Sequence, residues 1–145
     1  MIRSWPFLCY KQGMLRIPRP LYAEIIEHLQ AVYPEEGCGL LAGIEEQVFT
    51  SYPIENILHS QTAFEMDPLQ QVKTMLTIEN EGKELLAIYH SHPQGPSLPS
   101  ETDIAQAYYP DTINIIVSLI HESAPSLRGF YIVAGTVSEV LIMVE

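Results

Sequence analysis

The chain has 145 residues, of which 7 are basic and 18 are acidic, so its formal net charge is −11. This length predicts a single domain over residues 1–145, with room for a real core. The acidic balance disfavours nucleic acid and anionic membranes as partners, because both are bound through basic patches. No segment approaches the roughly 20 apolar residues of a membrane span.

The N-terminus and the cysteines bear on the location of the protein. The apolar stretch near the N-terminus is short and is broken by Pro6, so we expect no signal peptide. Cys9 and Cys38 lie in dissimilar contexts, which does not indicate a disulfide framework. A cytoplasmic location is therefore expected.

The first half of the chain predicts an arm followed by three strands and two helices. Residues 1–13 are expected to form an extended arm, and Met14–Ile17 to form a paired strand. From Pro18 to Val32 apolar residues recur at helical spacing, which predicts a helix. Asp67 is placed to cap a second helix over Pro68–Asn80. Strands are expected near 39–44 and 47–54, and a loop is expected from Asn56 to Thr62.

The second half of the chain is richer in strands. An apolar run ending at Pro93 predicts a strand over 84–92, and a helix is expected over 100–108. Roughly alternating elements, with strands in excess at the end, predict an α+β fold in which a mixed sheet carries helices on its faces. The remaining strands are expected near 112–120, 127–135 and 137–144.

Two histidines at the end of the 84–92 strand are candidate metal ligands. Side chains at i and i+2 of a strand point to the same face, roughly 7 Å apart, so His90 and His92 can converge on one ion. On a helix the same pair would point nearly opposite ways. Apolar residues on both faces upstream predict a central strand that is covered on both sides. Leu86 and Ile88 are expected on one face, and Leu85, Ala87 and Tyr89 on the other.

Asp103 is the third candidate ligand and lies on a different element. The segment Pro99–Ala107 predicts a helix start with Ser100 as N-cap and Asp103 at the third helical position, within the positive end of the helix dipole. The Ser100–Asp103 pair also resembles a capping box, and we expect Asp103 to serve as cap and ligand together. Two neutral imidazoles and one carboxylate suit zinc, and three protein ligands leave a fourth position open, as in catalytic sites.

Other histidine motifs do not fit the chain. A metallo-β-lactamase-type motif needs Asp and His where this chain has Gln94 and Gly95. A cupin-type pair needs a glutamate earlier than Glu101, a non-haem iron triad has the reverse order, and a zinc finger or ribbon needs paired cysteines. The remaining histidines, His28, His59 and His121, stand alone and are interpreted as ordinary polar or surface residues.

A hydrolase with such a site also needs a carboxylate that is not a ligand, to take a proton from water and deliver it to the leaving group. The best candidate is Glu36, between Pro34 and the strand near 39–44. An acid at the mouth of a strand can project into a cleft. An acid in a turn is more often solvated, and the other acidic residues offer many rivals.

Together these segments resemble the JAMM (MPN+, Mov34/PAD-1) metalloprotease family. The resemblance rests on Glu36-x-Cys38-Gly39-Leu40-Leu41-x-Gly43, on His90-Ser91-His92-Pro93 and on Ser100-x-x-Asp103. It covers most of the chain, and no motif position departs from the active pattern. It implies a curved, barrel-like mixed sheet of the cytidine-deaminase-like type, flanked by three helices.

The resemblance also implies roles and a substrate. His90, His92 and Asp103 would bind one zinc ion per chain. Glu36 would act as general base and acid, and Ser100 would hydrogen-bond the oxyanion. Family members hydrolyse peptide or isopeptide bonds after the C-terminal Gly-Gly of ubiquitin-like proteins, and bacterial relatives act on sulfur-carrier proteins of the ThiS/MoaD type. Short loops favour such a small carrier, with its Gly-Gly tail bound by strand addition.

Alternatives remain for the function and for three segments. The chain could be a non-catalytic MPN-type interaction module with structural zinc, or a small-molecule amidohydrolase. Cys38 could be a zinc-responsive or redox thiol near Glu36, but a small buried residue behind the site is the favoured interpretation. Tyr108-Tyr109 could line a substrate groove, but a helix end packed on the core is the favoured interpretation. Phe64–Pro68 could border the groove or form an ordinary hydrophobic lead-in to a helix.

Overall fold

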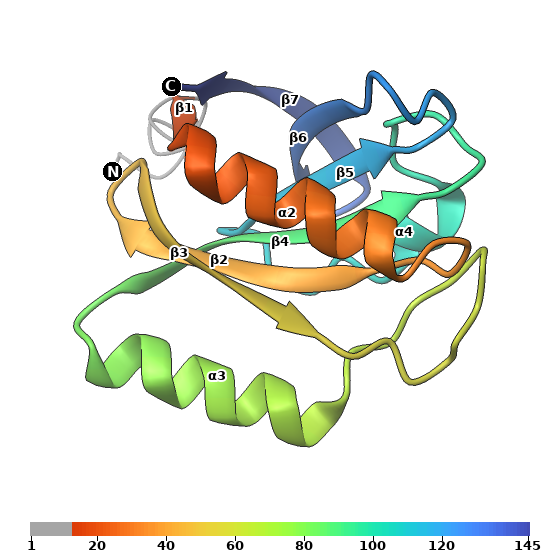
Figure 1. Ribbon diagram of the computed structural model, residues 1–145. Helices are drawn as coiled ribbons and strands as arrows, with labels where there is room; N and C mark the ends of the chain where they lie inside the picture. Colours follow the sequence, from red (N-terminus) through yellow and green to blue (C-terminus); the bar gives the residue numbers. More distant parts are fainter. Residues whose placement is uncertain (1–12) are drawn as a thin grey trace.

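The computed structural model describes residues 13–145, which form seven strands and three helices (Figure 1). Apart from Gly13, the expected arm over 1–13 lies outside the described residues. No helix in the described range is long and apolar enough to cross a membrane. The strands are β1 (Met14–Ile17), β2 (Cys38–Ile44), β3 (Gln47–Ile54), β4 (Glu84–His92), β5 (Ile113–Ser118), β6 (Ser126–Val133) and β7 (Thr136–Val144), and the helices are α2 (Arg19–Ala31), α3 (Pro68–Asn80) and α4 (Glu101–Ala105).

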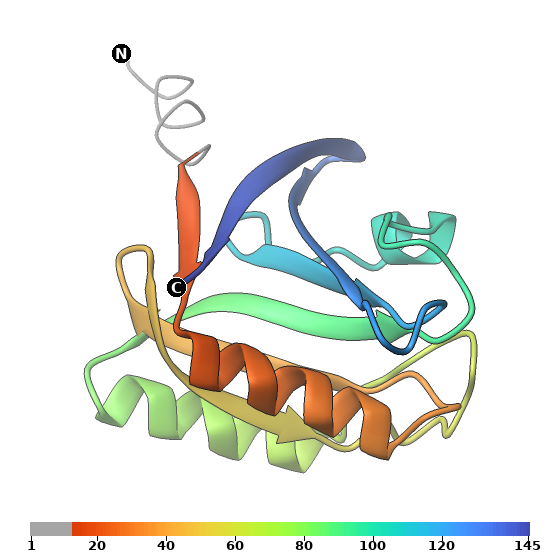
Figure 2. The ribbon, with the colours of Figure 1, turned by 45° about the horizontal axis from the view of Figure 1, so that its top comes forward.

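The seven strands close into a barrel in the order β1-β3-β2-β4-β5-β6-β7. β1 completes the ring by running parallel to β7, beside the C-terminus (Figure 2). β4 is a central strand that pairs antiparallel with β2 and parallel with β5. The expected barrel-like mixed sheet with three helices is therefore confirmed.

Helices cover the β2–β4 part of the sheet from both sides (Figure 1). Leu29 of α2 packs with Tyr89 of β4 in the main core. Ile78 of α3 packs with Leu40 of β2 in a second cluster. Ile104 of α4 packs against a third cluster formed by residues of β5 and β6. β4 is thus covered on both faces and is buried at Ala87 and at Tyr89–Ser91, and its C-terminal end is where the covered sheet opens towards α4.

A β-bulge changes which side chains of β4 share a face. The register of β2 against β4 shifts next to Ala42, whose partner is Leu85. Leu85 therefore packs with Ile88 beside α3, while Leu86 packs against the main core. The predicted faces of Leu85 and Leu86 were wrong, because alternation by two residues fails where one strand carries an extra residue.

The Tyr89 side chain of β4 contacts both Gly39 and His28, and these contacts explain the residue type at each position. Gly39 pairs with Tyr89, and a Cβ atom at Gly39 would fall on the Tyr89 ring. The Tyr89 side chain is fully buried, and its hydroxyl lies 2.7 Å from Nδ1 of His28 on α2. His28 is therefore an ordinary polar contact, as predicted.

One predicted helix cap is confirmed, and one helix is shorter than predicted. Asp67 Oδ1 accepts hydrogen bonds from the backbone N–H groups of Leu69 and Gln70, which makes it the N-cap of α3. α4 ends at Ala105, whereas a helix over 100–108 was expected. Pro110 disfavours helical backbone just before it, and the chain leaves the helix early enough for Gln106–Tyr109 to run along a pocket.

Candidate active site

β4 presents two histidines at its C-terminal end. The Nε2 atoms of His90 and His92 lie 3.2 Å apart, which confirms that the two rings converge from one face of the strand. His90 is buried and His92 is half-buried. The pair therefore lies where the covered sheet meets the surface.

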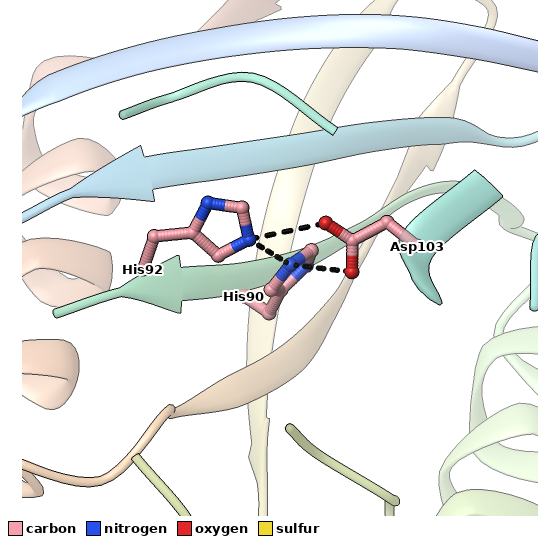
Figure 3. A group of neighbouring side chains, drawn as sticks. All are labelled: His90, His92 and Asp103. Atoms are coloured by element: carbon pink, nitrogen blue, oxygen red, sulfur yellow. Dashed lines mark hydrogen bonds and ion pairs between the residues drawn. The ribbon is translucent and has the colours of Figure 1, made fainter. Parts of the chain in front are cut away.

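Asp103 brings a carboxylate to the same point from α4 (Figure 3). Its Oδ1 lies 3.2 Å from Nε2 of His90, and its Oδ2 lies 3.0 Å from Nε2 of His92. Asp103 is the third residue of α4, and Ser100 is the N-cap. The structure therefore assembles the three predicted ligands from two separate elements.

The spacing of these donors fits a metal ion. One ligand atom from each of the three side chains lies within 4.8 Å of the other two. Ligands held about 2.0–2.1 Å from a tetrahedral zinc ion stand roughly 3.3–3.4 Å apart. The close contacts between the three side chains measure 3.0 to 3.2 Å. The group is able to hold a metal with little rearrangement.

The loop after β4 orients the ring of His92. Nδ1 of His92 lies 2.8 Å from the Pro96 carbonyl oxygen. A carbonyl only accepts, so Nδ1 donates its hydrogen there, and in the neutral ring the lone pair then lies on Nε2, which faces the shared point. The Ser118 hydroxyl donates to the Gly95 carbonyl at 2.6 Å and ties this loop to β5. His90 is stacked on Phe64, with ring centroids 4.6 Å apart.

Burial and mutual contacts set the charges of the three groups. Burial opposes ionisation of Asp103, but its hydrogen bonds with His90 and His92 outweigh burial and hold its pKa well below the usual range. Burial lowers the pKa of His90. Burial also acts to lower the pKa of His92, but Asp103 and the Pro96 carbonyl raise it overall. An ionised carboxylate beside a neutral imidazole is the state that a metal ion binds.

Glu36 lies in the turn that leads into β2 and is 5% exposed. Its carboxyl group interacts electrostatically with His92 and Asp103, so it lies within electrostatic range of the three-residue cluster. Burial raises the pKa of Glu36 to about 7, with His92 opposing that shift and Asp103 adding to it. A carboxyl group with such a pKa can both accept and return a proton near neutrality. The alternative of a solvated acid in a turn is excluded by this burial.

Ser100 lies at the exposed rim beside the cluster. Its hydroxyl oxygen accepts a hydrogen bond from the backbone N–H of Asp103 at 3.1 Å. A hydroxyl group has one hydrogen to donate and two lone pairs, so this contact leaves the hydrogen free for another acceptor.

A pocket of about 170 Å³ opens beside His90 and Asp103. Phe64–Met66 and Gln106–Tyr109 contribute to its walls, which favours the groove-border alternative for the first three residues of Phe64–Pro68. Tyr108 is 73% exposed, and neither tyrosine of the 108–109 pair lies in a helix. The favoured interpretation of that pair as a packed helix end was wrong, and the groove alternative fits. The floor of the pocket includes Ile88, Asn114 and Ile116.

Two buried polar residues next to Glu36 were not singled out in the sequence. Asn56 Nδ2 donates to the Glu36 carbonyl oxygen at 2.9 Å. The Ser91 hydroxyl accepts from the Gly37 N–H at 2.9 Å. A serine between two ligands of an otherwise apolar strand is a signal that could have indicated Ser91. No pattern in the sequence marks Asn56, because its side chain bonds main-chain atoms, and three of its four partners lie 7 or more residues away.

The other residues singled out earlier have ordinary surroundings. Cys38 is fully buried, as expected, and burial raises the pKa of its thiol to about 12. His59 is exposed, with Nδ1 3.2 Å from Glu35, and His121 is exposed as well. Neither histidine belongs to the metal-binding group.

Comparisons with known proteins indicate the family to which the chain belongs. The family of prokaryotic homologues of the JAB domain matches residues 18–133. A probable TtuB-protein conjugate cleaving protease from Thermus thermophilus is 47% identical over 99 residues, which are 68% of this chain and 66% of that protein. A CysO-cysteine peptidase from Mycobacterium tuberculosis is 32% identical over 128 residues, which are 87% of this chain and 88% of that protein. The solution structure of a Desulfitobacterium hafniense protein matches with a TM-score of 0.84 and 30% identity, covering 91% of this chain and 93% of that one.

Proposed function

The chain belongs to the prokaryotic JAB family of JAMM (MPN+) hydrolases, and from this premise we propose that it is a zinc-dependent protease of carrier-protein conjugates. It would hydrolyse the peptide or isopeptide bond after the C-terminal Gly-Gly of a ubiquitin-like or ThiS/MoaD-like sulfur-carrier protein. The observation that carries this proposal is the convergence of His90, His92 and Asp103 beside the buried Glu36. The names of the Thermus and Mycobacterium relatives support the substrate class.

Zinc would be held by Nε2 of His90, Nε2 of His92 and the carboxylate of Asp103. When bound in such a site, zinc acts as a Lewis acid towards the scissile carbonyl and activates a water molecule. The ionised state of Asp103 and the Nδ1–H of His92 on Pro96 prepare these side chains for the metal. Because β4 and α4 fix the side chains from two directions, the site needs little ordering when the metal enters.

Glu36 would move the proton. Its carboxyl group would accept a proton from the attacking water and return it to the leaving amine, and the raised pKa of the buried group in the metal-free protein supports that role. Ser100 would donate its free hydroxyl hydrogen to the oxyanion, a contact commonly worth a few kcal/mol in the transition state. Both groups stand beside the cluster without being counted among its ligands.

The carrier tail would reach the site along the pocket beside His90. The pocket lined by Phe64–Met66 and Gln106–Tyr109 would receive the extended chain, and Met66 is already bridged to Asn56 as a short antiparallel pair. A tail can add to such backbone as a further strand, and glycines let it pass closely between side chains. We also propose that residues 1–145 form one domain of this family, since β1 to β7 form a single closed sheet.

The test uses purified protein with its zinc content measured, incubated with a sulfur-carrier protein extended beyond Gly-Gly and read by mass spectrometry. We expect cleavage directly after the second glycine and one zinc ion per chain. Glu36→Ala should abolish cleavage while zinc is retained. Glu35→Ala is the matched control, because Glu35 is the neighbouring acid and contacts His59 at the surface.

Three outcomes would contradict the proposal. They are zinc-free protein that cleaves as fast as the zinc-loaded form, Glu36→Ala protein that keeps its activity, and no cleavage of any carrier fusion. A parallel screen of short peptides and amides separates the alternative of a small-molecule amidohydrolase. Turnover of those small substrates without turnover of carrier fusions would favour that alternative.

A further inference from the structure

The peptide group that joins Glu36 to Gly37 is held at both ends by buried side chains. Asn56 Nδ2 donates to its carbonyl oxygen at 2.9 Å, and the Ser91 hydroxyl accepts from its N–H at 2.9 Å. The Glu36 N–H donates to the Ser60 carbonyl at 2.8 Å, and the Ser91 N–H donates to the Gly37 carbonyl at 3.0 Å. All four polar backbone groups of Glu36 and Gly37 are therefore hydrogen-bonded.

Asn56 uses all of its hydrogen-bonding capacity in this arrangement. Besides the Glu36 carbonyl, its amide donates to the Ala63 carbonyl at 3.1 Å. Its Oδ1 accepts from the N–H groups of Leu58 and Glu65, both at 3.1 Å. An asparagine amide offers two donors and two acceptor positions, so the group is saturated at 6% exposure. One side chain thereby connects Glu36 to residues 58–65, which run into the pocket wall at Phe64–Met66.

Ser91 holds the same peptide from the opposite side. It is fully buried and lies between His90 and His92 on β4. Alternation along the strand points its hydroxyl away from the two imidazoles, so it contacts Gly37 and leaves the histidines free. The strand that carries the two imidazoles is thus bonded directly to the turn that carries Glu36.

We propose that Asn56 and Ser91 are positioning residues that clamp the Glu36–Gly37 peptide between the pocket wall and the histidine strand. The proposal rests on the proposed function, because it assigns the clamp to the placement of Glu36. Neither residue touches substrate. Each acts through the main chain of the turn, which on its own is free to rotate about several bonds, and a displacement of about 1 Å can cost on the order of 100-fold in rate.

The variants are Asn56→Asp, Ser91→Ala and their combination. Asn56→Asp has nearly the same shape and keeps the Oδ1 contacts with Leu58 and Glu65. It replaces Nδ2 by an oxygen, so the hydrogen bonds donated to the Glu36 and Ala63 carbonyls are lost. Ser91→Ala removes only the acceptor for Gly37. Tyr89→Phe is the matched control, because it deletes a buried side-chain hydrogen bond on β4, with His28, without touching the clamped peptide.

We expect the Asn56→Asp and Ser91→Ala variants to lose about 10- to 100-fold in kcat, with KM changed less, while binding one zinc ion per chain. Tyr89→Phe should lower the melting temperature about as much as the two clamp variants do, but it should reduce kcat little. Because both clamp residues act on one peptide, the double variant should lose clearly less than the product of the two single losses. Amide hydrogen exchange at Gly37 should accelerate in both single variants, while Leu58 and Glu65 stay protected in Asn56→Asp.

The proposal is overturned if either single variant keeps wild-type kcat, if the losses multiply in the double variant, or if the loss follows zinc content. It is also overturned if Tyr89→Phe loses as much kcat as the clamp variants. If the wild-type protein cleaves no carrier fusion, the proposed function fails first. Amide hydrogen exchange at Gly37 then tests the clamp without any activity assay. Unchanged exchange in both single variants overturns the clamp proposal.

Discussion

Ser100 and Asp103 hold each other through two hydrogen bonds. The Ser100 hydroxyl accepts from the Asp103 N–H at 3.1 Å, and Oδ2 of Asp103 accepts from the Ser100 N–H at 2.9 Å. The same Oδ2 lies 3.0 Å from Nε2 of His92. The carboxylate is therefore aimed at the histidines by a helix cap, so the stability of the start of α4 and the geometry of the metal-binding group depend on each other.

Replacing Ser100 by Ala tests this link. The variant loses the capping hydroxyl, which typically costs about 1 kcal/mol of stability. It also loses the proposed oxyanion donor, so kcat should fall about 100-fold and zinc affinity several-fold. Ser100→Thr keeps a hydroxyl and should retain most of both. Initial rates and zinc competition with a chromophoric chelator measure these effects, and equal losses in the Ala and Thr variants would contradict the assigned role.

Replacing Asp103 by Asn tests its assignment as a ligand. The amide keeps the size of the side chain but removes the negative charge that the metal binds. We expect zinc content to fall from one ion per chain to well below one, and the melting temperature to become insensitive to chelator. Glu101→Gln is the matched control, because it removes an exposed acid from the same helical turn. Full zinc content in Asp103→Asn would contradict the assignment.

In the metal-free protein, the burial of Glu36 should make a contribution to stability that is lost as the pH rises towards neutrality. Its pKa rises from the ordinary 4.5 to about 7 in the folded state, so between these values the folded protein keeps a proton that the unfolded chain has lost. Ionisation then favours the unfolded chain. The contribution of Glu36 to the free energy of unfolding should fall through this window by up to about 3 kcal/mol.

The neutral variant Glu36→Gln isolates this contribution. Its free energy of unfolding should fall less between pH 4.5 and 7.5 than that of the wild-type protein. Denaturant unfolding of both proteins in the presence of chelator measures the difference at each pH. Parallel pH dependences in the two proteins would contradict a raised pKa at Glu36.

The tyrosine pair at the pocket should act on substrate binding. Tyr108 and Tyr109 line the pocket and are exposed, so replacing both by Ala leaves the core and the metal-binding group intact. We expect KM for a carrier fusion to rise about tenfold or more with kcat and zinc content nearly unchanged. Tyr33→Ala is the control, because Tyr33 is also exposed and lies outside this pocket. An equal rise in KM for the control would contradict the prediction.

Gly39 should tolerate no side chain. A methyl group there would fall on the ring of Tyr89, which is fully buried, so Gly39→Ala should cost about 1–3 kcal/mol of stability. Gly95→Ala is the control, because the added Cβ would meet its nearest atom at 3.6 Å, an ordinary contact. Denaturant unfolding of the zinc-loaded proteins measures both. Equal stabilities would contradict the close packing of Gly39 against Tyr89.

Several elements could be predicted because their causes are local. The bounds of β4 and α3 follow from an apolar run that stops at Pro93 and from the cap at Asp67. The two faces of β4 were mistaken at Leu85 and Leu86, because the bulge arises from pairing with β2 and leaves no mark in β4 itself. The end of α4 was misplaced because the chain leaves the helix after Ala105, and Gln106–Tyr109 line the pocket instead of continuing the helix.

The sequence by itself determined which side chains could meet a metal: His90 and His92 share a face through the two-residue period of a strand, and Ser100 places Asp103 through the spacing of a helix cap. Only the tertiary structure decided that Glu36 stands beside them with a raised pKa, and that Asn56 and Ser91 hold it there. Periodicity and capping act over a few residues. Burial and desolvation depend on groups that are distant in the chain and come together only when the barrel closes.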